Sequence, residues 1–394
     1  MKGFALSVGR PGAPLHAAAH SHHPWPDVTR EAQELAWRDA ARLLDRKWDH
    51  IFAAVIPAAQ SHVARQLALP DASTIAFGPN THAFVLRILS CLPTGRPARI
   101  LTTDSEFMSF SRQIARLEEE KLASVTRVAT EPFDTFDERF KEKAAAGGHD
   151  LVFFSQVFFN SGYAVQNLAA IVRAVPDADT FVVIDGYHGF MALPTDLSAI
   201  ASRSFYLAGG YKYAMAGEGA CFLHCPPGYG MRPLDTGWYA GFGALGKHSD
   251  GVAYAPDGSR FLGATFDVSA LYRFNAVQDW LAGESMDVPS MLTRIRELEI
   301  LFLQELGRAG ASIDSSMLVV TDEKMRGRFL TFGTAHAAEI TNALAARNVI
   351  VDHRGDRLRI GFGVYHEDDS AIELARVIAN CCPGAAAPAK QMGA

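Results

Sequence analysis

Two side chains in the middle of the sequence have types and spacing that could do chemistry together. Asp185 ends the apolar run TFVVID, and Lys212 lies in the Gly/Tyr-rich segment GGYKYAMAGEG. An apolar run that stops on an acid is typical of an inner strand of a parallel sheet, and open α/β sheets bind ligands at the ends of such strands. Aromatic rings and backbone around Lys212 predict a lowered amine pKa and a nucleophilic nitrogen.

A carboxylate and an activated lysine at one sheet edge are what an enzyme that uses pyridoxal phosphate (PLP) requires. The lysine forms a Schiff base with the aldehyde, and the carboxylate keeps the ring nitrogen protonated so that the ring accepts electrons. The ordinary alternatives are a loop acid for Asp185 and a solvated surface lysine for Lys212. The small residues after Lys212 favour the chemical interpretation, because they let the backbone approach a ligand closely.

The segments DGYH and GYKYAMAGEGACFLH resemble the PLP site of the class V aminotransferase family, and most closely its kynureninase branch. The resemblance implies that Asp185 pairs with the ring nitrogen and Lys212 forms the Schiff base. It implies that His188 approaches the ring oxygen and that Tyr211 holds the phosphate. It also implies the fold type I architecture of PLP-dependent transferases and a homodimer with its active sites at the interface.

The segment TIAFGPNTHAFVLRIL predicts a strand, a turn and a helix that begins at Asn80 and Thr81. Backbone N–H groups at a helix start, with a hydroxyl nearby, make a good phosphate cradle. An Asn or Thr cap is common on its own and stabilises a helix by only about 1 kcal/mol. Its place in the sequence resembles the family's phosphate loop, which predicts that Asn80 and Thr81 bind the cofactor.

Three further segments gain roles from the resemblance. In ILTTDSEFMSF the residue that would stack on the cofactor ring is Phe107, for which core packing is the alternative. In FFSQVFFNSGYAVQNL, Phe158 stands where many relatives carry an Asn or Gln that hydrogen-bonds the oxygen of the cofactor ring. Phe158 cannot make this bond, so His188 is expected to be the partner of the ring oxygen and the pocket is expected to be more apolar. The segment PLDTGWYAGFG resembles a kynureninase loop that crosses the dimer, so Trp238 is a candidate phosphate neighbour in the partner's site.

Substrate contacts are predicted at both ends of the chain. In DRLRIGFG, Arg359 resembles the arginine that binds the substrate carboxylate, a task that suits its planar fork; a salt bridge is the alternative. His20 and Ser21 stand where relatives carry an Asn-Ser-like motif at the pocket entrance, so they are expected to help choose the substrate. No matching acid or cysteine spacing accompanies the histidines near His20, and we expect no metal site.

The elements that must position these residues alternate between about residues 75 and 270. Short apolar runs and helical segments follow each other there, which predicts a mostly parallel, doubly wound α/β sheet. The remainder predicts a small α+β domain. We expect an N-terminal segment at 1–30, a large PLP-binding domain at 31–275, a small C-terminal domain at 276–382 and a tail at 383–394.

Composition limits the possible partners. A net charge of −6 and a pI near 6.2 argue against nucleic acid or an anionic membrane as the main partner. The sequence has no apolar run of membrane-spanning length and no signal-peptide pattern, so we expect a cytoplasmic enzyme with a small amino-acid substrate. The five cysteines are few, odd in number and not arranged as paired CxxC motifs, which argues against a disulfide framework or structural zinc.

The sequence leaves the reaction open. Kynureninase-like hydrolysis of an amino acid is the leading hypothesis, with 2-oxo-acid-dependent aminotransfer as the runner-up. Epimerase or lyase activity and a non-catalytic PLP-fold binding protein are further alternatives. The desulfurase branch is less favoured, because it needs a cysteine thiolate in the small domain and residues 310–350 contain no cysteine. A Rossmann nucleotide binder is disfavoured too, since no G-x-G-x-x-G follows a predicted strand.

Overall fold

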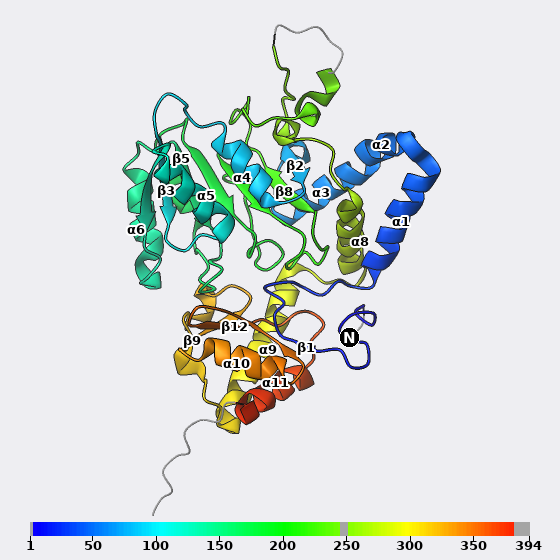
Figure 1. Ribbon diagram of the computed structural model, residues 1–394, viewed down its shortest axis with the longest axis vertical. Helices are drawn as coiled ribbons and strands as arrows, with labels where there is room; N and C mark the ends of the chain where they lie inside the picture. The colour runs from blue at the N-terminus through cyan, green and yellow to red at the C-terminus, as the bar shows by residue number, and fades with distance from the viewer. Residues whose placement is uncertain (1–2, 245–250, 382–394) are drawn as a thin grey trace, which may run out of the picture. The chain divides into compact units, whose positions relative to one another are not determined.

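The computed structural model describes residues 3–244 and 251–381, and these form two compact units (Figure 1). The larger unit comprises Val28–Phe159 and Tyr163–Val288. The smaller unit comprises the residues up to Asp27, the short segment Asn160–Gly162 and the residues from Pro289 onward. The predicted tail at 383–394 lies outside the described residues, and the predicted boundaries at 30 and 275 stay predictions.

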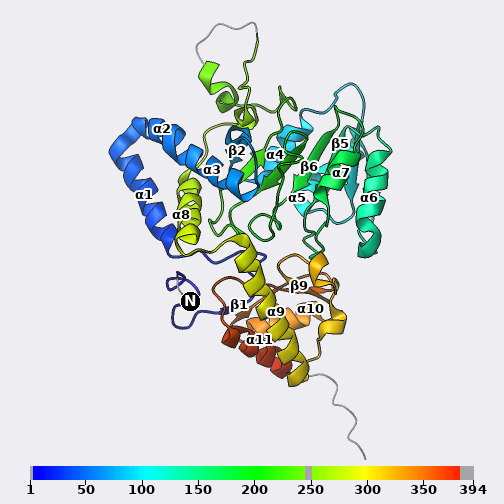
Figure 2. The same cartoon turned by 180° about the vertical axis from the view of Figure 1, so that it is seen from behind.

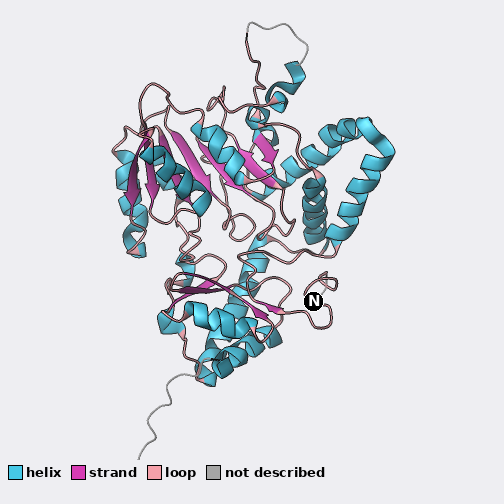
Figure 3. Cartoon of the chain, viewed as in Figure 1, coloured by secondary structure: helices cyan, strands magenta, loops and turns pink. Residues whose placement is uncertain are grey.

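A seven-stranded sheet forms the centre of the larger unit (Figure 3). Its strand order is β2-β8-β7-β6-β5-β3-β4. β8 runs antiparallel to β2 and β7, and all other neighbours are parallel, which confirms the predicted mostly parallel α/β sheet. The strands are β2 (Ile75–Gly78), β3 (Ala98–Thr103), β4 (Ala123–Val128), β5 (Leu151–Ser155), β6 (Phe181–Asp185), β7 (Ser204–Ala208) and β8 (Cys221–His224).

Helices cover both faces of this sheet. Figure 1 shows α4 and α5 in front of one face, and Figure 2 shows α7 in front of the other. Phe84 and Ile88 of α4 and Phe110 and Ile114 of α5 share one buried core with the strands. The helices are α1 (Val28–Leu43), α2 (Lys47–His50), α3 (Ile56–Gln66), α4 (Thr81–Leu89), α5 (Met108–Glu119), α6 (Phe136–Ala145), α7 (Leu168–Ala174) and α8 (Ser269–Gly283).

The sequence pattern missed one strand, β4. Only its two ends, Ala123 and Val128, are buried, and the four residues between them are exposed or half-buried. An edge strand of this kind lacks the continuous apolar run that marks the inner strands of a parallel sheet. Its place at the edge therefore rests on its pairing with β3.

The smaller unit has its own core and an α+β arrangement, as predicted. A three-stranded antiparallel sheet has the order β11-β12-β9, and β1 pairs with β10 in parallel. Leu298, Phe302 and Leu374 belong to its fully buried core. The elements are β1 (Leu15–His16), α9 (Val288–Ala309), β9 (Leu330–Gly333), α10 (Ala337–Ala345), β10 (Val349–Ile350), β11 (Asp352–Arg354), β12 (Arg357–Ile360) and α11 (Asp368–Cys381).

Candidate active site

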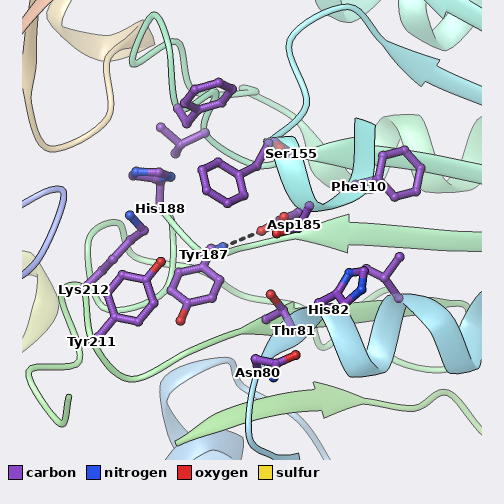
Figure 4. A pocket seen from close by; sticks show the side chains of 15 residues that line it. Asn80, Thr81, His82, Phe110, Ser155, Asp185, Tyr187, His188, Tyr211 and Lys212 are labelled. Atoms are coloured by element: carbon purple, nitrogen blue, oxygen red, sulfur yellow. Dashed lines mark hydrogen bonds between the residues drawn. The ribbon is translucent and has the colours of Figure 1, made fainter. Parts of the chain in front are cut away.

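A cavity of about 140 Å³ opens in the larger unit where β5, β6 and β7 end and α4 begins (Figure 4). One water needs about 10–15 Å³ by this kind of measure, so the cavity is large enough for a small organic ligand. It brings together most of the cofactor residues predicted from the sequence. Those that line it are Asn80, Thr81, Phe107, Asp185, His188, Tyr211 and Lys212.

Asp185 is the last residue of β6, whose preceding residues are buried on both faces of the sheet. Its Oδ1 accepts a hydrogen bond of 2.9 Å from the Tyr187 N–H, the only hydrogen bond to this side chain among the described residues. Burial raises the pKa of Asp185 to about 6, while this N–H and the nearby Lys212 charge act in the opposite direction. The carboxylate is therefore ionised at neutral pH and can pair with a protonated ring nitrogen.

Lys212 lies in the loop after β7, beside two tyrosine rings whose centroids are 4.9 Å apart. Its Nζ lies 5.1 Å from the ring centroid of Tyr211 and 5.6 Å from that of Tyr187. Cation–π contacts of this length hold an ammonium group over a ring face. A Cβ at Gly209 would come within 2.2 Å of the Tyr187 hydroxyl, so only glycine lets the loop pass beneath that ring. Tyr187 is a site residue that sequence reasoning missed, although it lies between two predicted ones.

Arg273 on α8 was also missed, and it holds the loop that follows Lys212. Its Nε donates to the Ala216 carbonyl and its Nη2 to the Glu218 carbonyl, both at 2.8 Å. The side chain is buried. The available signal was a lone arginine in the apolar helical run SALYRFNAVQDWLAG. Because buried carbonyls need donors, Arg273 fixes the backbone that presents the lysine.

The start of α4 offers a phosphate cradle. The Asn80 side chain caps the helix by accepting a hydrogen bond of 2.9 Å from the Ala83 N–H. Thr81 is the first helical residue, and both residues line the cavity. The N–H groups of a first helical turn and the positive end of the helix dipole favour an anion.

These groups fit PLP. Figure 4 shows Asp185, Lys212 and the start of α4 with Thr81 around one space. Asp185 supplies an anion for a cationic ring nitrogen, and Lys212 supplies an amine for an aldehyde. The first turn of α4 supplies donors for a phosphate.

The apolar wall of the cavity differs from the expectation for Phe158. Its side chain is fully buried outside the cavity and meets Phe136 with ring centroids 5.2 Å apart. Val157 and Phe159 line the cavity instead, and Phe159 meets the half-exposed Phe107 edge to face at 5.3 Å. Side chains alternate along extended backbone, so the neighbours of Phe158 face the ligand.

Trp238 does not line the cavity. It begins the 3-10 turn Trp238–Ala244, is 46 % exposed, and contacts Tyr239 and Phe242 with ring centroids 4.3 and 5.3 Å apart. Its predicted contact with a partner's phosphate stays a prediction.

Arg359, His20 and Ser21 belong to the smaller unit. Arg359 is 2 % exposed, and its Nε donates to Asp352 Oδ1 at 2.8 Å while Nη2 donates to Oδ2. His20 Nε2 lies 2.9 Å from the same Oδ1, and the His20 ring stacks on Phe329 at 4.7 Å. Burial acts to raise the pKa of Asp352, but His20 and Arg359 outweigh it and hold that pKa well below its usual range. The Arg359 guanidinium therefore forms an ion pair with the carboxylate of Asp352 in the same unit.

The described part of the chain holds neither a candidate metal site nor a helix that could span a membrane. No group of three or more His, Cys, Asp or Glu side chains there could hold a metal ion. No described helix combines the length and the apolar character needed to cross a membrane.

Comparison with known proteins identifies the relatives of the chain. The family model described as Aminotransferase class-V matches residues 19–364. A probable cysteine desulfurase of Vibrio cholerae is 25% identical over 229 residues, which is 54% of this chain and 53% of the relative. The match thus spans about half the length of that curated relative.

Solved structures share the fold at low sequence identity. A cystine C–S lyase in complex with cysteine persulfide has a TM-score of 0.79 at 16% identity, over 96% of this chain and 100% of that one. An apo cysteine desulfurase from Thermococcus onnurineus has a TM-score of 0.79 at 14% identity, over 96% and 97%. A C–S lyase variant with glycine covalently linked to PLP has a TM-score of 0.78 at 16% identity, over 95% and 99%.

Proposed function

Since the chain belongs to the aminotransferase class-V family, we propose that this PLP-dependent enzyme cleaves the Cβ–S bond of a sulfur-containing amino acid by elimination. The observation that carries the proposal is a cavity lined by both Lys212 and Asp185 and by no cysteine among the described residues. When bound, PLP makes the substrate Cα–H acidic by accepting electrons into its ring.

The names of the relatives favour sulfur chemistry over the kynureninase branch. The relatives reported above are cysteine desulfurases and a cystine C–S lyase. None is a kynureninase, so the loop around Trp238 is weak support for that branch. Kynureninase-like hydrolysis remains a second candidate because of that loop and the resemblance of the segments DGYH and GYKYAMAGEGACFLH.

Among sulfur reactions, three of the five cysteines of this chain favour elimination over transfer to an enzyme thiolate. Of the other two, Cys381 ends α11 and Cys382 lies outside the described residues. Burial raises the pKa of Cys91 to about 12 and that of Cys221 to about 11, and it raises the pKa of Cys225 as well. Thiols of this kind are inert, because the thiolate is the nucleophile. Residues 310–350 contain no cysteine at all. Elimination needs no enzyme sulfur.

Each step then uses a residue of the cavity. Lys212 takes the Cα proton, the Cβ–S bond breaks, and its electron pair leaves with the sulfur. Water then hydrolyses the remaining three-carbon enamine to pyruvate and ammonia. Asp185 would stabilise the charge of the PLP ring nitrogen, and Asn80 and Thr81 at the start of α4 would bind its phosphate. The apolar wall of Phe107 and Phe159 would contact the part of the substrate side chain near its sulfur.

The fate of the three substrate carbons tests the proposal. Purified protein loaded with PLP is incubated with L-cystine or L-cysteine, and pyruvate, alanine, ammonia and sulfide are quantified. Elimination yields pyruvate and ammonia in equal amounts. Alanine would instead indicate sulfur transfer, and alanine from kynurenine would indicate hydrolysis. A new amino acid that forms only with a 2-oxo acid would indicate aminotransfer. The Lys212→Ala variant should lose pyruvate formation by about 10²–10⁴-fold.

We also propose a homodimer and a cytoplasmic location, as expected from the sequence. Leu234, Trp238 and Phe242 are 69, 46 and 43 % exposed, and a second copy of the chain would cover such an apolar surface. Sedimentation velocity measures the mass in solution, and a single monomeric species would contradict the dimer.

A further inference from the structure

The buried acid Glu106 has no part in the proposed reaction. It lies one residue before Phe107 and is 4 % exposed. Its Oε1 accepts hydrogen bonds from Thr103 Oγ1 at 2.7 Å and from the Ser155 N–H at 3.2 Å. Its Oε2 lies 2.6 Å from Ser155 Oγ. The carboxyl group therefore ties the end of β3 to the end of β5.

This link reaches the neighbour of Asp185. Ser155 and Asp185 are paired residues on the parallel strands β5 and β6, and both line the cavity. Glu106 thus holds the backbone and the hydroxyl of the residue beside the carboxylate that faces the cofactor. It also holds the start of the segment that places Phe107 at the cavity.

Glu106 has no partner of opposite charge among the residues that the structure describes: no lysine, arginine or histidine there forms an ion pair with it. Burial raises the pKa of Glu106 to about 8; its hydrogen bonds oppose this shift, and the charge of Asp185 adds to it. The other acid on its segment, Asp104, is exposed and accepts hydrogen bonds from Ser105 and Thr130. Two close buried carboxylates cannot both be ionised cheaply.

We propose that Glu106 is a positioning residue that carries the single proton of this acid pair, so that Asp185 keeps its charge for the ring nitrogen. The proton sits on Oε2 and is donated to Ser155 Oγ, since Oε1 must accept from the Ser155 N–H. The Ser155 hydroxyl hydrogen then turns toward the cavity that this residue lines. The role assigned to Asp185 rests on the proposed function, whereas the proton on Glu106 does not.

The Glu106→Gln variant tests the proton, because glutamine copies a protonated glutamate in shape and in hydrogen bonding. Its carbonyl replaces Oε1 and its NH₂ replaces Oε2–H. If native Glu106 is neutral, the full-length variant without PLP should melt at least about 2 °C higher than wild type at pH 7. The difference in melting point between the variant and wild type should widen from pH 5 to pH 8. In this range the unfolded wild type ionises its glutamate whereas native Glu106 stays protonated, so only wild type loses stability from this group as the pH rises. A lower melting point at pH 7 would overturn the proposal, because a charged carboxylate would have lost its strong hydrogen bonds.

A direct readout covers the case in which the variant folds poorly. Infrared spectra of wild type with isotope-labelled glutamate carboxyl groups should show a protonated carboxyl band at pH 7 that disappears around pH 8. The same band should titrate at lower pH in Asp185→Asn, because the neighbouring charge is gone. Absence of the band at pH 7 would reject the proposal. Neither measurement uses turnover, so a failure here is distinct from a failure of the elimination reaction.

Glu299→Gln is the matched control. Glu299 is also fully buried, but it forms ion pairs with Arg296 and Arg326 at 2.7 and 3.3 Å. Its neutralisation should lower the melting point at pH 7, the opposite sign to Glu106→Gln. Equal effects of both variants would show that the response to glutamine is general and would remove the support for a neutral Glu106.

Discussion

The charge of Asp185 results from two opposing effects in the cavity. Burial disfavours the anion, whereas the Tyr187 N–H and the Lys212 ammonium favour it. The result is a pKa of about 6, above the ordinary value of 3.8. The side chain is thus an anion at neutral pH and a neutral acid at pH 5, within a range in which the protein can be studied.

This shift predicts how PLP affinity depends on pH. Because the ring nitrogen pairs with the anion, protonation of Asp185 below pH 6 weakens binding by up to about tenfold per pH unit. Fluorescence titration of PLP between pH 5 and pH 8 measures this slope. The phosphate of PLP titrates near the same pH, with a pKa of about 6, so the comparison is with Asp185→Asn, which should bind more weakly at pH 8 and show a shallower slope. Equal slopes would contradict the role of Asp185.

The ion pair of Arg359 and Asp352 predicts an effect that separates stability from substrate binding. Arg359→Ala leaves Asp352 without the fork and should lower the free energy of unfolding by about 3–5 kcal/mol. The double variant Arg359→Met/Asp352→Leu should recover part of that loss, because neither charge of the pair remains, while the buried His20 loses the carboxylate that its Nε2 contacts. Urea unfolding measures both changes.

The same double variant tests the substrate role of Arg359. If its guanidinium binds the substrate carboxylate, KM should rise at least about tenfold even where stability is recovered. A normal KM in the double variant would leave Arg359 with the ion pair alone.

The segment between β7 and β8 is a loop that carries Lys212, and backbone hydrogen bonds within the loop fix the chain around this residue. The Lys212 carbonyl accepts from the Met215 N–H at 3.0 Å, and the Gly210 carbonyl accepts from the Ala216 N–H at 2.8 Å. Arg273 on α8 satisfies two further carbonyls of the loop. A helix distant in the sequence therefore supplies hydrogen-bond donors to the loop that carries Lys212.

Loss of this arginine should reduce cofactor affinity as well as stability. Arg273→Met leaves two loop carbonyls without their donor, at a cost of about 2–3 kcal/mol of unfolding free energy. Arg260→Met is the control, since Arg260 is also buried and also donates to backbone carbonyls, those of Pro226 and Tyr229. Both variants should be destabilised, but only Arg273→Met should bind PLP more weakly. Equal PLP affinities would limit Arg273 to a structural role.

Each unit of the chain contains its own group of side chains with shifted pKa values. All residues that line the cofactor cavity belong to the larger unit. In the smaller unit, three histidines surround Tyr365: His23 and His366 are buried, and His16 is half-buried. Burial lowers the pKa of His16 to about 4 and that of His366 to about 3, and it lowers the pKa of His23 well below 6.5.

These histidines predict a loss of stability in mild acid. A histidine whose folded pKa lies below its unfolded pKa has no effect above pH 6.5. As the pH falls from 6.5 towards 4, the unfolded state binds the proton first, so each such histidine costs up to about 1.4 kcal/mol per pH unit. Urea unfolding at pH 7.5 and pH 5 measures the loss, and His23→Phe should reduce it. His336→Phe is the control, because His336 is exposed and paired with Glu339 in the same unit. Identical pH slopes in all three proteins would refute the assignment.

Local patterns in the amino-acid sequence were sufficient for the main elements and for the centre of the site. The run TFVVID ends at Asp185 because an inner parallel strand is apolar until it leaves the sheet, and that signal needs no knowledge of the neighbours. The same holds for Asn80 at the start of α4 and for the glycines around Lys212. Strand ends, helix caps and tight turns are set by residues next to each other in the chain.

Contacts between distant segments could not be predicted in this way. Strand register puts Ser155 beside Asp185, and packing brings Glu106 to Ser155, Arg273 to the loop that carries Lys212, and Asp352 to His20. Each of these pairs contains a residue that looks ordinary when the sequence is read in order. Their charges and hydrogen bonds depend on burial and on the partner across the fold, and both arise only when the chain has packed.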